Sequence, residues 1–126
     1  MYFDPVLDDL YSFYSVEGRE YHVLLDEEGI VIGGIGYAEF AAFDDCAELQ
    51  KLYLAKEAKG NGYGIELIAF IEERMKLAGY RLSYLETHDN LEAARHIYEK
   101  SGYEEIDRPA SVAHGAMNRF YIKPLV

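Results

Sequence analysis

The chain has 126 residues, half of them hydrophobic, and a formal net charge of −11. This length and composition predict one folded domain over residues 1–126 and argue against disorder. So acidic a chain, with no stripe of Lys and Arg, argues against a nucleic-acid partner. An acidic field attracts cationic small molecules such as amines, although acidity also serves solubility.

The compartment is expected to be the cytoplasm. No apolar run approaches the roughly 18–20 residues that span a membrane. The start of the chain is acidic and has no basic n-region of a signal peptide. The single Cys46 allows no internal disulfide, which fits a reducing environment.

Hydrophobic periodicity divides the chain into helices and strands with short connections. In chain order it predicts a helix over 6–14, strands over 21–26, 30–40 and 47–55, a helix over 65–78, a strand over 81–88, a helix over 89–102, and strands over 103–107 and 117–125. The first two strands form a hairpin, and Gly33 and Gly34 predict a bulge or a close backbone approach within it. Gly79 and Gly102 end the second and third helices.

Strand, helix and strand between residues 47 and 88 form a βαβ unit. Its strands are therefore expected to be parallel, with a right-handed crossover. Side chains of its first strand are expected to alternate strictly, with Leu49 and Tyr53 on one face and Leu52 on the other. The order β-β-β-α-β-α-β-β predicts an α/β protein with a mixed sheet and helices on its faces.

The segment KGNGYG at residues 59–64 lies between a strand and a helix N-terminus. Such an N-terminus presents unpaired N–H groups and a partial positive charge, and glycines let the backbone approach a ligand closely. A phosphate or pyrophosphate site made of backbone amides is expected here. The alternating glycines fit neither the Walker spacing nor the dinucleotide fingerprint G-x-G-x-x-G.

Two motifs resemble those of the GNAT superfamily of N-acetyltransferases. KGNGYG at 59–64 is similar to the family signature [RQ]-x-x-G-x-[GA], with Lys59 where Arg or Gln is usual. NLEAARHIYEKSGY at 90–103 is similar to N-x-x-A-x-x-x-Y-x-x-x-G-[FY]. The resemblance covers about residues 20–126, and its two motifs stand at the right separation. It implies a central mixed, mostly antiparallel sheet with a splayed parallel strand pair and helices on both faces.

The resemblance implies that acetyl-CoA lies in the splay between strands 47–55 and 81–88. The pantetheine would pair with the backbone of the first strand at Leu52, Tyr53 and Leu54. The pyrophosphate would rest on the loop at Lys59, Gly60, Asn61, Gly62, Tyr63 and Gly64. Asn90 and Ala93 complete the cofactor-binding set, with Asn90 contacting the pantetheine arm or an ordered water. Asp89 or Asn90 is also expected to cap its helix.

Acetyl transfer by direct attack of a primary amine in a ternary complex needs a base for the amine proton and an acid for the leaving thiolate. The resemblance places Tyr98 near the thioester sulfur, and a phenol is mostly protonated at neutral pH, so it is the expected acid. Glu48, on the strand before the loop, is the candidate base. Four scattered His and one Cys lack metal-ligand spacing, so no metal is expected.

Fewer features of the sequence bear on the site that binds the acetyl acceptor. Family members usually begin with a strand and two helices, whereas only 20 residues precede residue 21 here. The expected acceptor is a small-molecule amine or a peptide amine, and a homodimer is left open because family members often dimerise. The alternative function is a non-catalytic acyl-CoA-binding or regulatory module.

Overall fold

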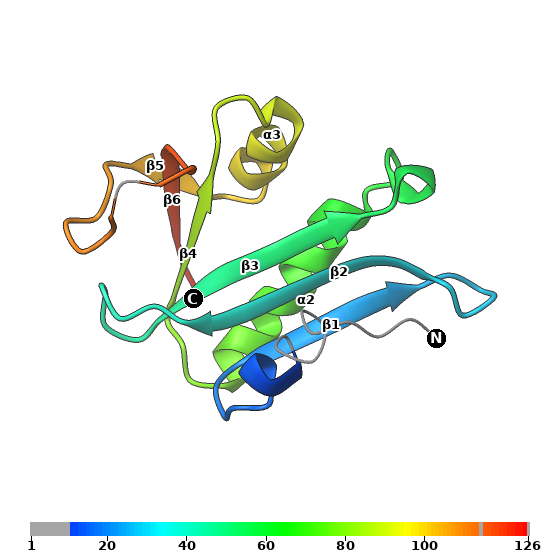
Figure 1. Ribbon diagram of the computed structural model, residues 1–126, viewed down its shortest axis with the longest axis horizontal. Coiled ribbons are helices and arrows are strands. Elements are labelled where there is room, and N and C mark those ends of the chain that lie inside the picture. The colour runs from blue at the N-terminus through cyan, green and yellow to red at the C-terminus, as the bar shows by residue number, and fades with distance from the viewer. Residues whose placement is uncertain (1–10, 114, 126) are drawn as a thin grey trace.

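Six strands form one mixed sheet in a computed structural model that describes residues 11–113 and 115–125. The sheet order is β1-β2-β3-β4-β6-β5 (Figure 1). The elements are β1 Glu20–Leu25, β2 Val31–Glu39, β3 Cys46–Leu54, the 3-10 helix η1 Lys56–Ala58, α2 Tyr63–Leu77, β4 Leu82–Thr87, α3 Glu92–Lys100, β5 Glu104–Ile106 and β6 Arg119–Pro124. This order confirms the predicted succession of helices and strands. No helix among the described residues is long and apolar enough to cross a membrane.

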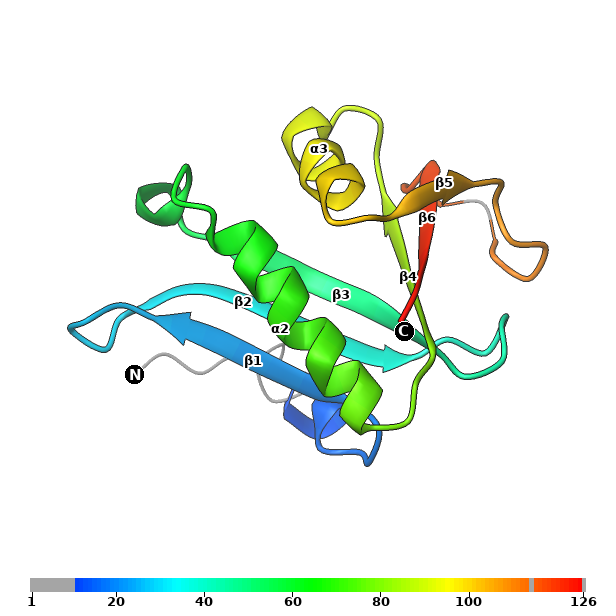
Figure 2. The ribbon, with the colours of Figure 1, turned by 180° about the vertical axis from the view of Figure 1, so that it is seen from behind.

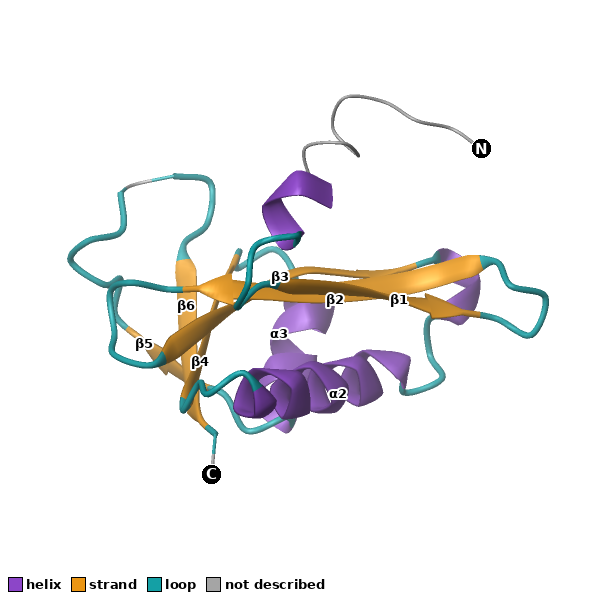
Figure 3. Ribbon diagram, turned by 90° about the horizontal axis from the view of Figure 1, so that it is seen from below, coloured by secondary structure: helices purple, strands orange, loops and turns teal. Residues whose placement is uncertain are grey.

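Helices lie on both faces of the sheet. Figure 3 shows α2 and α3 on one face and a short helical turn, residues 11–14, on the other. This turn is the described part of the helix predicted over 6–14, and the rest of that prediction lies outside the described residues. Figure 2 shows α2 running along the part of the sheet made by β1, β2 and β3. The main core lies between α2 and the sheet, and includes buried Ile35, Ile68 and Met75.

The parallel pair predicted for the βαβ unit is confirmed, and it is short. Strand β3 pairs with β4 only where Cys46–Glu48 faces Leu82–Tyr84. Beyond these residues β3 stays paired with β2, whereas β4 stays paired with β6. The two strands therefore diverge toward their carboxyl ends, as Figure 1 shows, and α3 lies beside the opening.

A bulge interrupts β3, and it makes the prediction of strict alternation wrong. Gly34 pairs with Tyr53 and Gly36 pairs with Gln50, so two residues of β3 oppose one residue of β2. Lys51, in the bulge, has a φ of 53°. One extra residue reverses the side-chain alternation beyond it. Leu52 consequently packs against the same core as residues before the bulge, rather than pointing away from it.

The glycines of β2 allow a close approach, as the sequence predicted. A Cβ atom on Gly33 would lie 2.9 Å from the backbone oxygen of Tyr53, and one on Gly34 would lie 2.6 Å from the Tyr21 hydroxyl. The same hydroxyl donates a hydrogen bond to the carbonyl of Lys51, across β2 on the bulged strand. The bare surface of β2 thus lets a ring from β1 reach the bulge.

Both helices end as predicted, with a glycine just past the last turn. Gly79 and Gly102 each have a φ of 97°, which side chains rarely adopt. In each case the following N–H reaches back to a carbonyl five residues earlier, from Tyr80 to Met75 and from Tyr103 to Tyr98, both at 3.0 Å. This hydrogen-bond pattern satisfies the exposed carbonyls of a helix C-terminus.

The predicted N-cap of α3 is wrong. The capping position is Leu91, and no side chain makes a capping hydrogen bond there. Instead the backbone N–H of Asn90 donates to Nδ1 of His88, and that of Asp89 donates to the side chain of Asn118. These two residues belong to the connection before the helix, which leaves the Asn90 side chain available for another contact.

Candidate active site

A cleft of about 760 Å³ opens where β3 and β4 diverge, between the glycine loop and α3. Its walls come from the end of β3, the start of α2 and the first turns of α3. The lining residues are Leu52, Tyr53, Leu54, Lys59, Gly60, Gly62, Tyr63, Gly64, Ile65, Asn90, Leu91, Glu92, Ala93, Ala94, Ile97 and Tyr98. The fold therefore brings to one cleft every residue expected to bind the cofactor except Asn61, together with Tyr98.

Two of the three loop glycines adopt a conformation that other residues avoid. Gly60 has a φ of 83° and Gly62 has a φ of 77°, and nothing lies within 4 Å of a Cβ added at either. Glycine is therefore favoured at these two positions because of the backbone conformation, and not because a side chain would lack space. Gly62 is also the N-cap of α2, so this conformation sets how the chain enters the helix.

Gly64 has a different role, because it lies inside α2 and is buried. A Cβ atom there would approach the side chain of Ile97 on α3 to 3.3 Å and that of Leu54 to 3.6 Å. The absent side chain thus allows α3 to pack against the first turn of α2. This packing brings the two walls of the cleft together.

Asn61 points into the loop instead of lining the cleft. Its Nδ2 donates to the carbonyls of Ala58 and Lys59 at 3.2 and 3.3 Å. These bonds hold the loop closed on the short helix η1. The Asn61 side chain therefore stabilises the loop. The backbone amide of Asn61 remains a predicted contact for a ligand.

Tyr98 lines the cleft and is 7% exposed. Its ring packs against the rings of Tyr103 and Tyr121, at centroid distances of 6.3 and 6.4 Å. Burial raises the pKa of the Tyr98 phenol above its ordinary value, so the hydroxyl is protonated at neutral pH. A buried, protonated phenol that lines a cleft can donate a proton to a group bound there.

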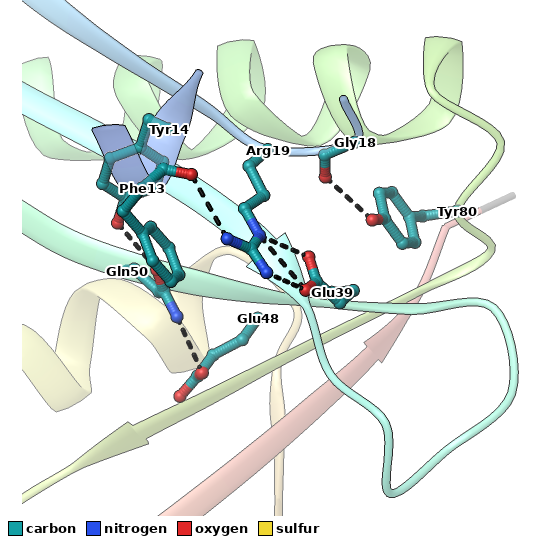
Figure 4. Close-up of polar contacts among 8 residues, drawn as sticks. All are labelled: Phe13, Tyr14, Gly18, Arg19, Glu39, Glu48, Gln50 and Tyr80. Atoms are coloured by element: carbon teal, nitrogen blue, oxygen red, sulfur yellow. Dashed lines mark hydrogen bonds and ion pairs between the residues drawn. The ribbon is translucent and has the colours of Figure 1, made fainter. Parts of the chain in front are cut away.

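Glu48 does not line this cleft. It lies on β3 before the bulge, with its side chain on the face opposite α2, where Gln50 donates a hydrogen bond to it (Figure 4). Burial raises the pKa of Glu48, the charge of Glu86 raises it further, and the bond from Gln50 opposes both. A carboxylate of raised pKa is a better proton acceptor than an ordinary one.

Replacing Glu48 with Gln should make the protein more stable at neutral pH. A carboxyl whose pKa is raised by folding binds its proton more tightly in the folded chain, so the free energy of unfolding falls as pH rises through that pKa. We expect Glu48→Gln to melt about 2–4 °C higher than wild type at pH 7. The difference should vanish below about pH 4, where both states are protonated. An equal difference at both pH values in thermal unfolding would contradict this.

Five further residues line the cleft that sequence reasoning did not select: Ile65, Leu91, Glu92, Ala94 and Ile97. Most of them come from α3 and the residue before it. The apolar spacing within NLEAARHIYEK marks this helix as amphipathic, but spacing does not separate a face that packs on the core from one that borders a cleft. Their positions follow from the packing of α3 beside α2.

Cys46 is buried, and burial raises the pKa of its thiol to about 12. Such a thiol is protonated at neutral pH and is not an activated nucleophile. Within residues 11–113 and 115–125, no group of three or more His, Cys, Asp or Glu side chains could hold a metal ion. The cleft itself offers backbone amides of the glycine loop, the Tyr98 phenol and the Glu92 carboxylate.

The family model described as Acetyltransferase (GNAT) family matches residues 2–103, so the chain belongs to this family. It is 39% identical over 105 residues to YjgM of Escherichia coli strain K12, described as an uncharacterized N-acetyltransferase. That match covers 82% of this chain and 62% of YjgM. The chain spans less than two thirds of the length of the curated relatives it matches.

Solved structures show the same fold. A GNAT-family acetyltransferase of Staphylococcus aureus Mu50 superposes with a TM-score of 0.84 at 22% identity, over 97% of this chain and 77% of that one. A phosphinothricin acetyltransferase of Sinorhizobium meliloti, solved in complex with acetyl-CoA, superposes with a TM-score of 0.77 at 25% identity. That match covers 95% of this chain and 68% of the other. The sheet with its splayed parallel pair is therefore the GNAT fold, as predicted from the two motifs.

Proposed function

We propose that the protein transfers an acetyl group from acetyl-CoA to a primary amine. The observation that carries this proposal is the cleft itself, in which a helix N-terminus with a glycine loop and a buried phenol face one space. The loop amides suit a pyrophosphate, because unpaired N–H groups and the helix dipole both favour an anion. The exposed end of β3 offers backbone groups to an extended amide such as pantetheine.

Each protein group then has one task in the transfer. Glu48 accepts a proton from the amine as its nitrogen bonds to the thioester carbon. Tyr98 donates its proton to sulfur as the carbon–sulfur bond breaks, and regains one from solvent afterwards. An amide of β3, at Leu52, polarises the carbonyl. Because Glu48 does not line the cleft, its proton transfer runs through a water molecule.

The acceptor we propose is a small-molecule or peptide amine that attacks through a neutral nitrogen and carries positive charge elsewhere in the molecule. A net charge of −11 concentrates cations near the surface, and it speeds their encounter with the protein most at low ionic strength. The carboxyl groups of Glu48 and Glu86 face the same side of the sheet where β3 and β4 begin to diverge. Both features favour an amine over an anionic acceptor.

Calorimetry with acetyl-CoA, followed by a turnover screen, tests the function. We expect saturable binding of acetyl-CoA, and CoA release with members of a panel of polyamines, amino acids, aminoglycosides and peptide N-termini. Absence of binding at millimolar acetyl-CoA would contradict the proposal. Binding without turnover across the panel would favour the alternative, a non-catalytic acyl-CoA-binding module, for which the position of Glu48 outside the cleft is the supporting observation.

A further inference from the structure

Two hydrogen bonds join Glu48 to the helical turn of residues 11–14, on the face of the sheet opposite α2 (Figure 4). Nε2 of Gln50 donates to Oε1 of Glu48 at 2.9 Å. Oε1 of Gln50 accepts from the hydroxyl of Tyr14 at 2.7 Å. All three side chains are partly buried. Tyr14 and Gln50 are 36 residues apart, so this contact forms only when the chain folds.

The direction of these two bonds depends on the charge of Glu48. A carboxylate only accepts hydrogen bonds, so Gln50 must turn its NH₂ group toward Glu48 and its carbonyl oxygen toward Tyr14. The Tyr14 hydroxyl must then donate, and it can, because burial raises its pKa to about 12. A protonated Glu48 would impose no such orientation on the amide. A hydroxyl donor at Tyr14 thus favours the ionised form of Glu48.

The turn that carries this hydroxyl is fastened to two other parts of the fold (Figure 4). Arg19 pairs with Glu39 at the end of β2, with Nε 2.8 Å from the carboxylate, and its guanidinium lies 4.2 Å from the ring centroid of Phe13. Arg19 also donates to the Phe13 carbonyl at 3.3 Å. The hydroxyl of Tyr80, after α2, donates to the carbonyl of Gly18 at 2.8 Å. The donor is therefore held in place from outside its own turn.

The other groups that act on Glu48 come from β3 and β4. Glu86 on β4 repels its charge and raises its pKa. Glu86 in turn accepts a hydrogen bond of 2.9 Å from Tyr84, the residue paired with Glu48 across the parallel strands. Burial keeps both the Tyr84 phenol and the Cys46 thiol protonated, with pKa values raised above their ordinary ones. The bond from Gln50 is thus the interaction that opposes burial and Glu86.

We propose that Tyr14 is a positioning residue that acts through Gln50 to orient the Glu48 carboxylate and keep it ionised for accepting the amine proton. This inference rests on the proposed function. It adds residues that influence catalysis on the face of the sheet opposite α2, in β3 and in the turn of residues 11–14. Neither Tyr14 nor Gln50 lines the cleft that takes the cofactor, so their loss should leave acetyl-CoA binding unchanged.

The test compares Tyr14→Phe with Tyr11→Phe, a matched loss of one hydroxyl on the same turn. Tyr11 is 78% exposed, so its hydroxyl is surrounded by water. The pKa of Glu48 is measured by NMR titration of its side-chain carboxyl in the free protein, and the acid limb of the pH profile of kcat/KM is measured alongside. We expect Tyr14→Phe to raise the pKa of Glu48 and the apparent pKa of the acid limb by about half a pH unit each. Gln50→Met should raise each by about one pH unit. Tyr11→Phe should change neither.

The outcomes separate this inference from the proposed function. An unchanged pKa of Glu48 in folded Tyr14→Phe and Gln50→Met would overturn the positioning role, whatever the activity. A shifted pKa with an unmoved acid limb would overturn it too, because the carboxylate would then not serve the reaction. If wild type transferred no acetyl group, the proposed function would fail and the role in it would fail as well. The NMR titration would still report on the hydrogen bonds themselves.

Discussion

Tyr98→Phe should lower kcat about 100-fold and leave the dissociation constant for acetyl-CoA unchanged. The substitution removes only the hydroxyl, since the ring keeps its packing against Tyr103 and Tyr121. Without a donor at the sulfur, the thiolate has to leave unprotonated or take its proton from water. Single-turnover kinetics at saturating acetyl-CoA measures the chemical step separately from binding.

Tyr103→Phe is the matched control for this loss. Its hydroxyl is hydrogen-bonded to Ser83 at 2.7 Å inside the core, and the residue does not line the cleft. Removing it leaves a buried Ser83 hydroxyl without that partner, which should cost about 1 kcal/mol of stability. Turnover should stay near wild type. Equal losses of kcat in both variants would contradict an acid role specific to Tyr98, because removing a core hydroxyl elsewhere would then have the same effect.

Gly62→Ala should weaken acetyl-CoA binding about tenfold, with kcat at saturation little changed. A methyl group meets no neighbour at this position, so the whole effect comes from a φ of 77° that alanine disfavours. The loop would relax toward negative φ and turn its amides away from the phosphate position. Calorimetric titration with acetyl-CoA gives the dissociation constant directly.

Gly29→Ala is the control that separates backbone cost from ligand loss. Gly29 has a φ of 82°, also has open space around it, and lies in the hairpin turn away from the cleft. Both variants should lose similar stability in thermal unfolding. Only the loop variant should lose affinity, and a parallel loss in Gly29→Ala would contradict a specific role for the glycine loop.

Local patterns predicted most of the fold. The hairpin, the βαβ unit and both helix ends follow from residues close in sequence, such as the turn at Gly29 and the stops at Gly79 and Gly102. The cleft was predictable for the same reason, since its glycine loop and the helix with Tyr98 each carry a contiguous motif. The resemblance of these two motifs to one family then placed them on opposite sides of the same splay.

The features that escaped prediction depend on contacts between distant residues. The bulge in β3 is bonded to Tyr21, whose hydroxyl donates to the carbonyl of Lys51 across 30 residues. The link from Tyr14 to Gln50 spans 36 residues. Periodicity within a strand carries no information on such partners. The failed N-cap has another cause, because α3 begins later than predicted, with Leu91 at the capping position and the two predicted caps in the connection before it.

The bulge at Lys51 divides β3 into two halves in which alternate positions face the core, odd-numbered before the bulge and even-numbered after it. Before it, the odd-numbered Leu49 belongs to the core, and after it the even-numbered Leu52 and Leu54 do. A deletion of Lys51 would remove the extra residue, complete the ladder with β2, and leave Leu52 opposite Ile35, with both leucines after the bulge on the core face. The bulge is therefore a position in β3 at which the pairing with β2 can absorb a one-residue deletion. Deleting a residue before the bulge without losing the bulge would instead flip the side chains of that half of the strand, so the two deletions should differ in their cost to stability.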